Sequence, residues 1–179
     1  MARTLEEKLA LPIVKLDLGS GLNRHEKELD EYIYLDGDSA PGIDIVCNWD
    51  KIPLDSGVVD YVHSSETIEH IPAYETHIVL PEWNRIMKIG ATLELTTPNL
   101  DYVCRAWARG EKDHDWVIRN LYGDRASAHH NHYVLYNKET LEEVLTKYGF
   151  GEFNFKTVGS HDSREWWWLA MSCKKIKDC

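Results

Sequence analysis

The feature that most constrains the fold is a short apolar run that stops at two closely spaced glycines. Residues 13–18 read IVKLDL and are followed by Gly19, Ser20 and Gly21. Such a run, bounded by turn residues, is typical of a buried strand in a parallel sheet. Glycines directly after a strand let the backbone approach a ligand closely, although they often form only a tight turn. The loop is therefore a candidate binding site.

The rest of the chain alternates between strand-like and helix-like patterns. Further strands are expected at residues 32–35, 43–47, 58–63, 92–97, 153–158 and 167–173, and helices at 3–10, 22–30, 74–88 and 138–148. Lys88 and Gly90 should close helix 74–88, because a cation and a glycine are common at helix C-termini. The alternation predicts one α/β domain over residues 1–179, with helices on both faces of the sheet.

Residues 99–137 do not fit this alternation. The segment is rich in Trp, Tyr, His and Asp. Irregular stretches of this length are usually functional or disordered, and so many aromatic residues argue against disorder. We expect a lid or substrate wall inserted into the domain at about residues 99–137.

Composition excludes several classes of protein. The formal net charge of −10 repels polyphosphate, and no dense Lys/Arg stripe offsets it, so no nucleic-acid partner is expected. The four cysteines are widely spread without a CxxC pair, which suits a reducing compartment. No apolar run approaches the ~18 residues of a membrane span, and the first ten residues do not resemble a signal peptide. A cytoplasmic protein without a membrane partner is expected.

A carboxylate follows the second expected strand. Asp36 stands where an acidic side chain accepts both hydroxyls of a ribose. The alternative is that Asp36 has only a structural role, as an aspartate in a turn before Gly37.

Four ordered blocks together resemble the class I S-adenosylmethionine-dependent methyltransferases, in particular small stand-alone members. They are VKLDLGSGLN (14–23), YIYLDGD (32–38), NWDKIPLDSGVVDYVHSSETIEHI (48–71) and EWNRIMKIGATLELTTPN (82–99). The resemblance implies a Rossmann-like α/β fold with a mainly parallel seven-strand sheet and an antiparallel last strand. The connections between strands two, three and four are too short for full crossovers, so the helices on that side should be clipped.

The resemblance also implies an S-adenosyl-L-methionine site. Asp17 and the loop Gly19, Ser20 and Gly21 would line the methionine part of the cofactor, and Asp36 would bind its ribose. Asp50 would accept from the adenine amino group. Trp49 or Ile52 would pack on adenine, because Gly37 stands where an apolar residue is common. The backbone around Ser64 and Ser65 would face the ammonium and sulfonium groups.

The catalytic candidates are Glu66, His70, His130 and His132. Glu66, Glu69 and His70 follow the fourth strand, either as the start of a helix or with a general base among them. His129, His130 and His132 could be solvated or core residues, substrate or acid–base groups, or metal ligands. No metal is assigned, since adjacent histidines cannot all converge without a turn.

The sequence thus predicts methyl transfer to an unidentified small-molecule or sugar acceptor, with Tyr102, Trp107 and the histidines of residues 129–132 among its contacts. Three competing functions remain open: a nicotinamide-dependent oxidoreductase, an aminopropyl transferase, and a catalytically silent methyltransferase-like cofactor-binding or partner protein. The oxidoreductase would need a fuller glycine motif, because Asn23 stands at the third glycine position. The aminopropyl transferase would need paired aspartates that we do not find in the usual place. The oligomeric state cannot be read from the sequence.

Overall fold

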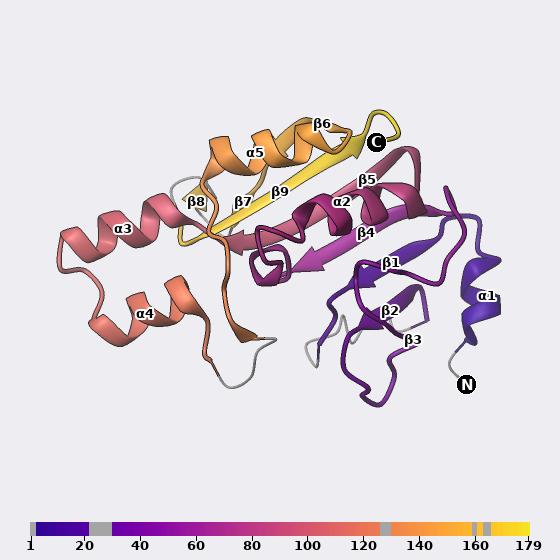
Figure 1. The fold of residues 1–179 in the computed structure, drawn as a ribbon, viewed down its shortest axis with the longest axis horizontal. Coiled ribbons are helices and arrows are strands. Elements are labelled where there is room, and N and C mark those ends of the chain that lie inside the picture. Colours follow the sequence, from indigo (N-terminus) through magenta and orange to yellow (C-terminus); the bar gives the residue numbers. More distant parts are fainter. Residues whose placement is uncertain (1–2, 22–29, 126–129, 159–160, 163–165) are drawn as a thin grey trace.

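The computed structural model describes residues 3–21, 30–125, 130–158, 161–162 and 166–179. Seven strands form one sheet in the order β3-β2-β1-β4-β5-β9-β6 (Figure 1). These strands are β1 (Lys15–Leu18), β2 (Tyr32–Asp36), β3 (Ile45–Val46), β4 (Val59–Ser65), β5 (Met87–Pro98), β6 (Phe150–Phe155) and β9 (Trp168–Lys175). The short strands β7 (Thr157–Val158) and β8 (His161–Asp162) form a separate hairpin.

The pairing directions confirm the predicted topology. The pairs β1–β2, β2–β3, β1–β4 and β4–β5 are parallel, whereas β9, the last strand in the sequence, runs antiparallel to both β5 and β6. Residues 37–44 and 47–58, which connect β2, β3 and β4, contain no helix. The expectation of clipped helices at this edge is therefore confirmed.

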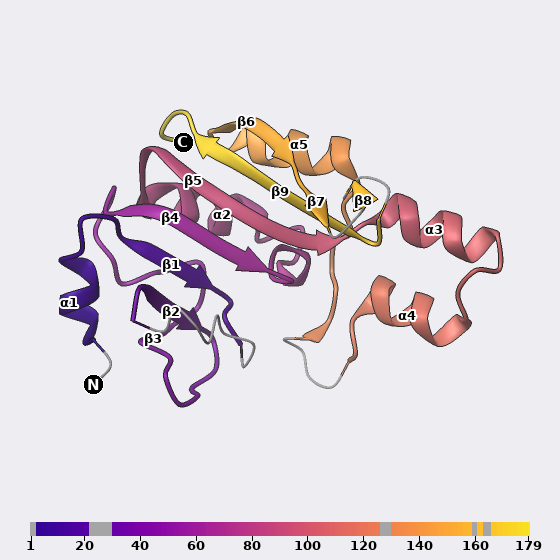
Figure 2. The same ribbon diagram turned by 180° about the vertical axis from the view of Figure 1, so that it is seen from behind.

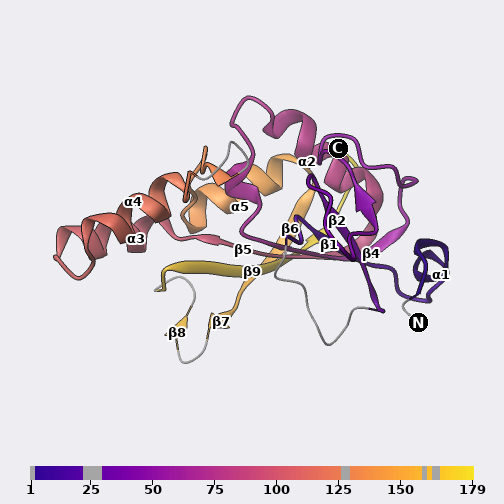
Figure 3. The ribbon, with the colours of Figure 1, turned by 90° about the horizontal axis from the view of Figure 1, so that it is seen from below.

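One face of the sheet carries the main core. Leu16, Ile33, Val62 and Leu93 pair in one row across four strands, and each is fully buried. The helices α2 (Thr76–Ile86) and α5 (Lys138–Lys147) cover this face (Figures 2 and 3). Successive strand residues point to opposite faces, so this row defines the apolar side of the sheet.

The opposite face is more polar than a sheet buried on both sides would be. Tyr61 donates a 2.7 Å hydrogen bond to Glu94, which also pairs with Lys156. The short helix α1 (Leu5–Leu9) packs here against β2, with the Lys8 ammonium 5.3 Å from the centre of the Tyr34 ring. Among the described residues, helices cover one face of the sheet in full; the helix predicted at residues 22–30 lies almost wholly outside them.

The boundary between α2 and β5 differs from the prediction. The helix ends at Ile86, and β5 begins at once with Met87, so Lys88 and Gly90 lie within the strand. Gly90 has a φ of +84°, next to a register shift in the pairing of β4 with β5. A glycine with positive φ serves a β-bulge as well as a helix end, which explains the wrong boundary.

The segment 99–137 is more regular than expected. It contains α3 (Leu100–Ala108) and α4 (His114–Tyr122), which project from the end of the sheet (Figures 1 and 2). Asn99 and Asp113 cap these helices by accepting hydrogen bonds from backbone N–H groups of the first turns. Whether the segment acts as a lid stays a prediction. No helix among the described residues is long and apolar enough to cross a membrane, and the cytoplasmic location also stays a prediction.

Candidate functional site

A cleft of about 1070 Å³ lies at the carboxyl ends of β1, β2 and β4. Most of the residues selected from the sequence line it, namely Asp17, Gly19, Ser20, Gly21, Asp36, Trp49, Asp50, Ser65, Glu66, His70 and His130. Ser64 and His132 are not among the lining residues, and His129 lies outside the described residues. Ligands of open α/β sheets bind at this edge of the strands, so the cleft is the candidate site.

Gly19 brings the loop after β1 against the end of β4. Its φ is +72°, and a Cβ at this position would lie 2.3 Å from the Thr67 hydroxyl oxygen. The Gly19 and Ser20 nitrogens donate to the Leu35 carbonyl oxygen at 2.9 and 3.1 Å. A side chain at position 19 would therefore push the loop away from Thr67 and the end of β4.

Asp36 holds the same loop from the end of β2. One carboxylate oxygen accepts a 2.7 Å hydrogen bond from the Gly21 nitrogen, and the other accepts a 2.9 Å bond from the Asp38 nitrogen. This confirms that Asp36 lies beside the glycine loop. Each carboxylate oxygen has a second lone pair available for a ligand hydroxyl.

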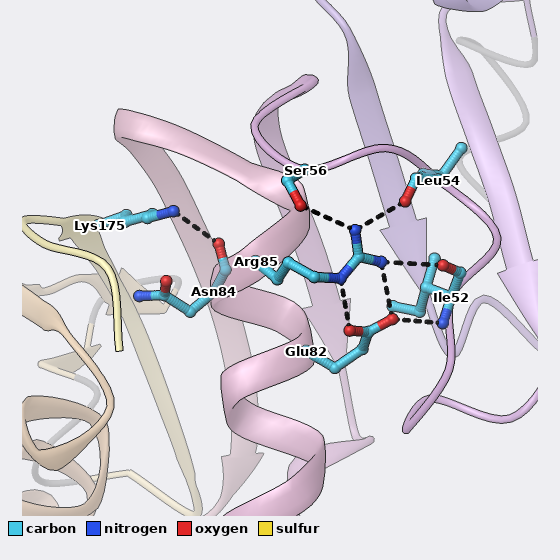
Figure 4. Close-up of polar contacts among 7 residues, drawn as sticks. All are labelled: Ile52, Leu54, Ser56, Glu82, Asn84, Arg85 and Lys175. Atoms are coloured by element: carbon cyan, nitrogen blue, oxygen red, sulfur yellow. Dashed lines mark hydrogen bonds and ion pairs between the residues drawn. The ribbon is translucent and has the colours of Figure 1, made fainter.

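Side chains of helix α2 hold the segment that carries Trp49 and Asp50. Arg85 donates to the carbonyl oxygens of Leu54 (2.8 Å) and Ile52 (3.0 Å) and forms a bidentate ion pair with Glu82 (Figure 4). Glu82 in turn accepts a 2.7 Å hydrogen bond from the Ile52 nitrogen. This network sets the position of the loop between β3 and β4.

Serine residues at the end of β4 differ in exposure. The Ser65 hydroxyl is exposed and lies 2.6 Å from that of Thr96 on β5. Ser64 is buried, and its hydroxyl has no hydrogen-bond partner among the described residues. Only Ser65 can therefore offer a side chain to a ligand in the cleft.

Two carboxyl groups with little access to solvent follow β4. Glu66 lines the cleft with a φ of +52°, and burial raises its pKa to about 7. Glu69, in the short 3-10 helix η1 (Ile68–His70), is fully buried, and burial together with the Glu66 charge raises its pKa well above the usual range. The two carboxyls contact each other, so their pair favours a shared proton.

Two histidines lie next to these carboxyl groups. The ring centres of His70 and His132 are 4.9 Å apart at an angle of 74°. His70 Nδ1 lies 2.9 Å from the carbonyl oxygen of Asn131, and His132 Nδ1 lies 2.8 Å from that of Asn120. Burial lowers the pKa of both rings, which favours the neutral imidazole.

The remaining wall of the cleft comes from residues that the sequence did not single out. Tyr74, Ile78 and Tyr133 line it with exposed fractions of 73%, 46% and 49%. Their only sequence signal is apolar character close to His70 and His132. Tyr102 and Trp107 do not line the cleft; Tyr102 packs against Trp116 and Trp166 instead.

The arrangement divides the cleft by chemistry. One part offers the close approach of the glycine loop after β1 and the carboxylates that follow β2 and β3. The other part brings carboxyl and imidazole groups beside exposed aromatic side chains. The first suits a nucleoside with free hydroxyls, and the second suits proton transfer or cation binding next to a small molecule.

Comparisons with known proteins identify the family and the fold. A family model described as a methyltransferase domain matches residues 2–151. Solved structures with the same fold include S-adenosylmethionine-dependent methyltransferases from Thermotoga maritima (17% identity, TM-score 0.65, covering 90% of this chain and 81% of that one), Methanosarcina mazei (17%, 0.60, 91% and 92%) and Archaeoglobus fulgidus (18%, 0.60, 90% and 85%). A search of curated proteins gave no match.

Proposed function

Because this chain belongs to the class I S-adenosylmethionine-dependent methyltransferases, we propose that it methylates a hydroxyl group of a small polar molecule or sugar. The observation that carries this proposal is the position of Glu66 and His70. Both line the same cleft as the glycine loop and Asp36, so groups suited to proton transfer stand beside the cofactor site.

The residues of the first part of the cleft fit the cofactor. Asp36 is held beside Gly21 and has lone pairs left for the ribose hydroxyls. Ser20 lines the cleft with a buried hydroxyl that has no partner among the described residues, as expected for a group that meets a polar ligand. We assign Asp17 and the glycine loop to the methionine part, and Trp49 and Asp50 to adenine.

The acceptor would occupy the part of the cleft between Glu66, His70 and His130. Tyr74 and Tyr133 supply exposed aromatic surface there, and such faces stack on sugar rings or small planar molecules. The His130 Nδ1 atom lies 3.4 Å from a carboxylate oxygen of Asp124. This contact orients the His130 ring at the cleft wall. In this proposal His130 and Tyr133, which follow α4, contact the acceptor. The helices α3 and α4 supply none of the described lining residues.

When bound, S-adenosylmethionine would supply a methyl group on a cationic sulfur, which is a good leaving group. The chain has to hold the acceptor oxygen in line with the methyl–sulfur bond, exclude water and remove one proton. We assign the removal of the hydroxyl proton to Glu66, because this residue lines the cleft directly after β4.

The test is formation of S-adenosylhomocysteine from S-adenosylmethionine with a panel of small hydroxylated compounds. The proposal predicts that some hydroxylated compounds are methylated on oxygen, and that Glu66→Gln loses this activity while binding S-adenosylhomocysteine normally. Methylation confined to amines or carbon atoms, or full activity of Glu66→Gln, would refute the proposal.

A further inference from the structure

We propose that Glu69, His70 and His132 form a binding site for one divalent transition-metal ion such as Zn²⁺ or Mn²⁺. Each of the three residues offers one ligating atom, and these atoms all lie within 4.8 Å of one another. Ligands of a bound zinc ion stand about 3–3.5 Å apart, given bond lengths near 2.0–2.2 Å. Small side-chain rotations would therefore close the site around an ion.

The two histidines are oriented as metal ligands usually are. A backbone carbonyl only accepts hydrogen bonds, so Nδ1 of each ring must carry the proton that it donates to Asn131 or Asn120. This tautomer leaves the lone pair on Nε2, the nitrogen available to an ion. Metal-bound histidines characteristically donate their other ring nitrogen to a carbonyl or carboxylate, which fixes the ring.

Glu69 supplies a carboxylate with one oxygen uncommitted. The Thr97 hydroxyl donates a 3.0 Å hydrogen bond to one oxygen. The other oxygen is buried and receives no hydrogen bond from the described residues, apart from the contact with the neighbouring Glu66 carboxyl. Two carboxyls in contact away from water need either a shared proton or a positive partner, and a divalent cation would supply the second.

The backbone holds these ligands together across a long sequence separation. The nitrogens of Tyr133 and Val134 donate to the Glu69 carbonyl oxygen at 2.8 and 3.2 Å. Gly123, with a φ of +75°, lets α4 end against the same segment, since a Cβ there would lie 1.8 Å from the His130 carbonyl oxygen. His132 is therefore placed beside His70 by main-chain contacts as well as by its own side chain.

The ligand chemistry limits which ion the site would take. Two imidazoles and one carboxylate favour Zn²⁺, Mn²⁺ or Fe²⁺ over Ca²⁺ and Mg²⁺, which prefer oxygen ligands. Three protein ligands also leave coordination positions open, as in catalytic metal sites. His70 lines the cleft, so an open position would be accessible from the acceptor side.

The site deepens the proposed function and rests on it for its role. A bound divalent cation lowers the pKa of a hydroxyl that ligates it, so this site would select acceptors that present a hydroxyl to the ion. The competing interpretation is a purely structural cluster in which the carboxyl and imidazole groups stabilise each other.

Metal binding by the purified chain, stripped with a chelator, distinguishes the two. We expect one Zn²⁺ per chain by calorimetry, and one Co²⁺ per chain by its visible absorption. His132→Ala and Glu69→Gln should each weaken binding at least about tenfold. His77→Ala, which removes an exposed histidine on α2, is the matched control and should leave the affinity unchanged.

Failure of the wild-type chain to bind Zn²⁺ and Co²⁺, or an equal loss in His77→Ala and His132→Ala, would overturn the metal site. If Glu69→Gln does not fold, His132→Ala decides the result, since His132 is only half-buried. S-adenosylhomocysteine binding by the metal-free chain separates the two proposals: its loss would count against the cofactor site, whereas retained binding without metal affinity would remove the metal site alone.

Discussion

The Tyr133 nitrogen donates a 2.8 Å hydrogen bond to the carbonyl oxygen of Glu69. This bond ties the end of the 99–137 segment to the 3-10 helix that follows β4. It brings His130 and Tyr133 to the wall of the cleft and His132 to the side of His70. The acceptor side of the cleft is therefore built by two parts of the chain that are distant in sequence.

Asp36→Ala should weaken binding of S-adenosylhomocysteine at least about 30-fold while the chain still folds, because two ribose hydroxyls lose a charged acceptor worth about 2 kcal/mol. Calorimetry measures the change. Asp115→Asn, an exposed acid on α4, is the control. Unchanged affinity in Asp36→Ala would mean that the ribose is bound elsewhere.

Gly19→Ala should destabilise the chain more than Gly21→Ala. Both glycines have positive φ, but a Cβ at Gly19 meets Thr67 at 2.3 Å, whereas a Cβ at Gly21 meets nothing within 4 Å. Overpacking of this kind costs about 1–3 kcal/mol, or roughly 2–10 °C in melting temperature. Adding Thr67→Ala should restore part of the loss. Equal melting temperatures of the two single variants would show that the loop does not depend on this close approach.

Arg85→Lys should loosen the loop that carries Trp49 and Asp50. Lysine keeps the charge but cannot reach Glu82 and the Ile52 and Leu54 carbonyls at the same time. We expect a loss of about 2 kcal/mol in unfolding free energy and weaker binding of S-adenosylhomocysteine. Denaturant unfolding and calorimetry measure the two effects, with Arg119→Lys on α4 as the control. A stable variant with normal affinity would separate this network from the cofactor site.

Glu66→Gln should lower turnover about 100-fold or more, the usual size of a general-base contribution. Its melting temperature should stay the same or rise, because one of two contacting carboxyls is removed from a site with little water. Steady-state kinetics with an acceptor from the panel and a thermal melt provide both numbers. A lower melting temperature with unchanged turnover would indicate that Glu66 is structural.

His130→Ala should reduce turnover while the cofactor affinity and melting temperature hardly change. The side chain is half-exposed, and its ion-pair partner Asp124, at 3.4 Å, is equally exposed, so little stability depends on the pair. We expect a reduction of about 100-fold if His130 handles a proton, and a smaller one if it only positions the acceptor. Kinetics as a function of acceptor concentration separate these cases, and wild-type kinetics would exclude both.

The sequence predicted the cofactor side of the cleft better than the acceptor side. Gly19 and Asp36 were identifiable because each directly follows or ends a strand, and parallel strands bring their carboxyl ends to one edge. The proximity of Glu69 and His132 depends on the three-dimensional path of the 99–137 segment, which no local sequence pattern specifies. The predicted helix end at Lys88 and Gly90 was wrong, because a β-bulge and a helix C-terminus both accept a glycine with positive φ.

A crystal structure with bound S-adenosylhomocysteine would decide whether the cleft binds the cofactor in the orientation that methyl transfer requires. We expect the ribose hydroxyls at the Asp36 carboxylate, adenine beside Trp49 and Asp50, and the sulfur facing Glu66 and His70. A cofactor bound outside this cleft, or one whose sulfur points away from Glu66 and His70, would contradict the assignment.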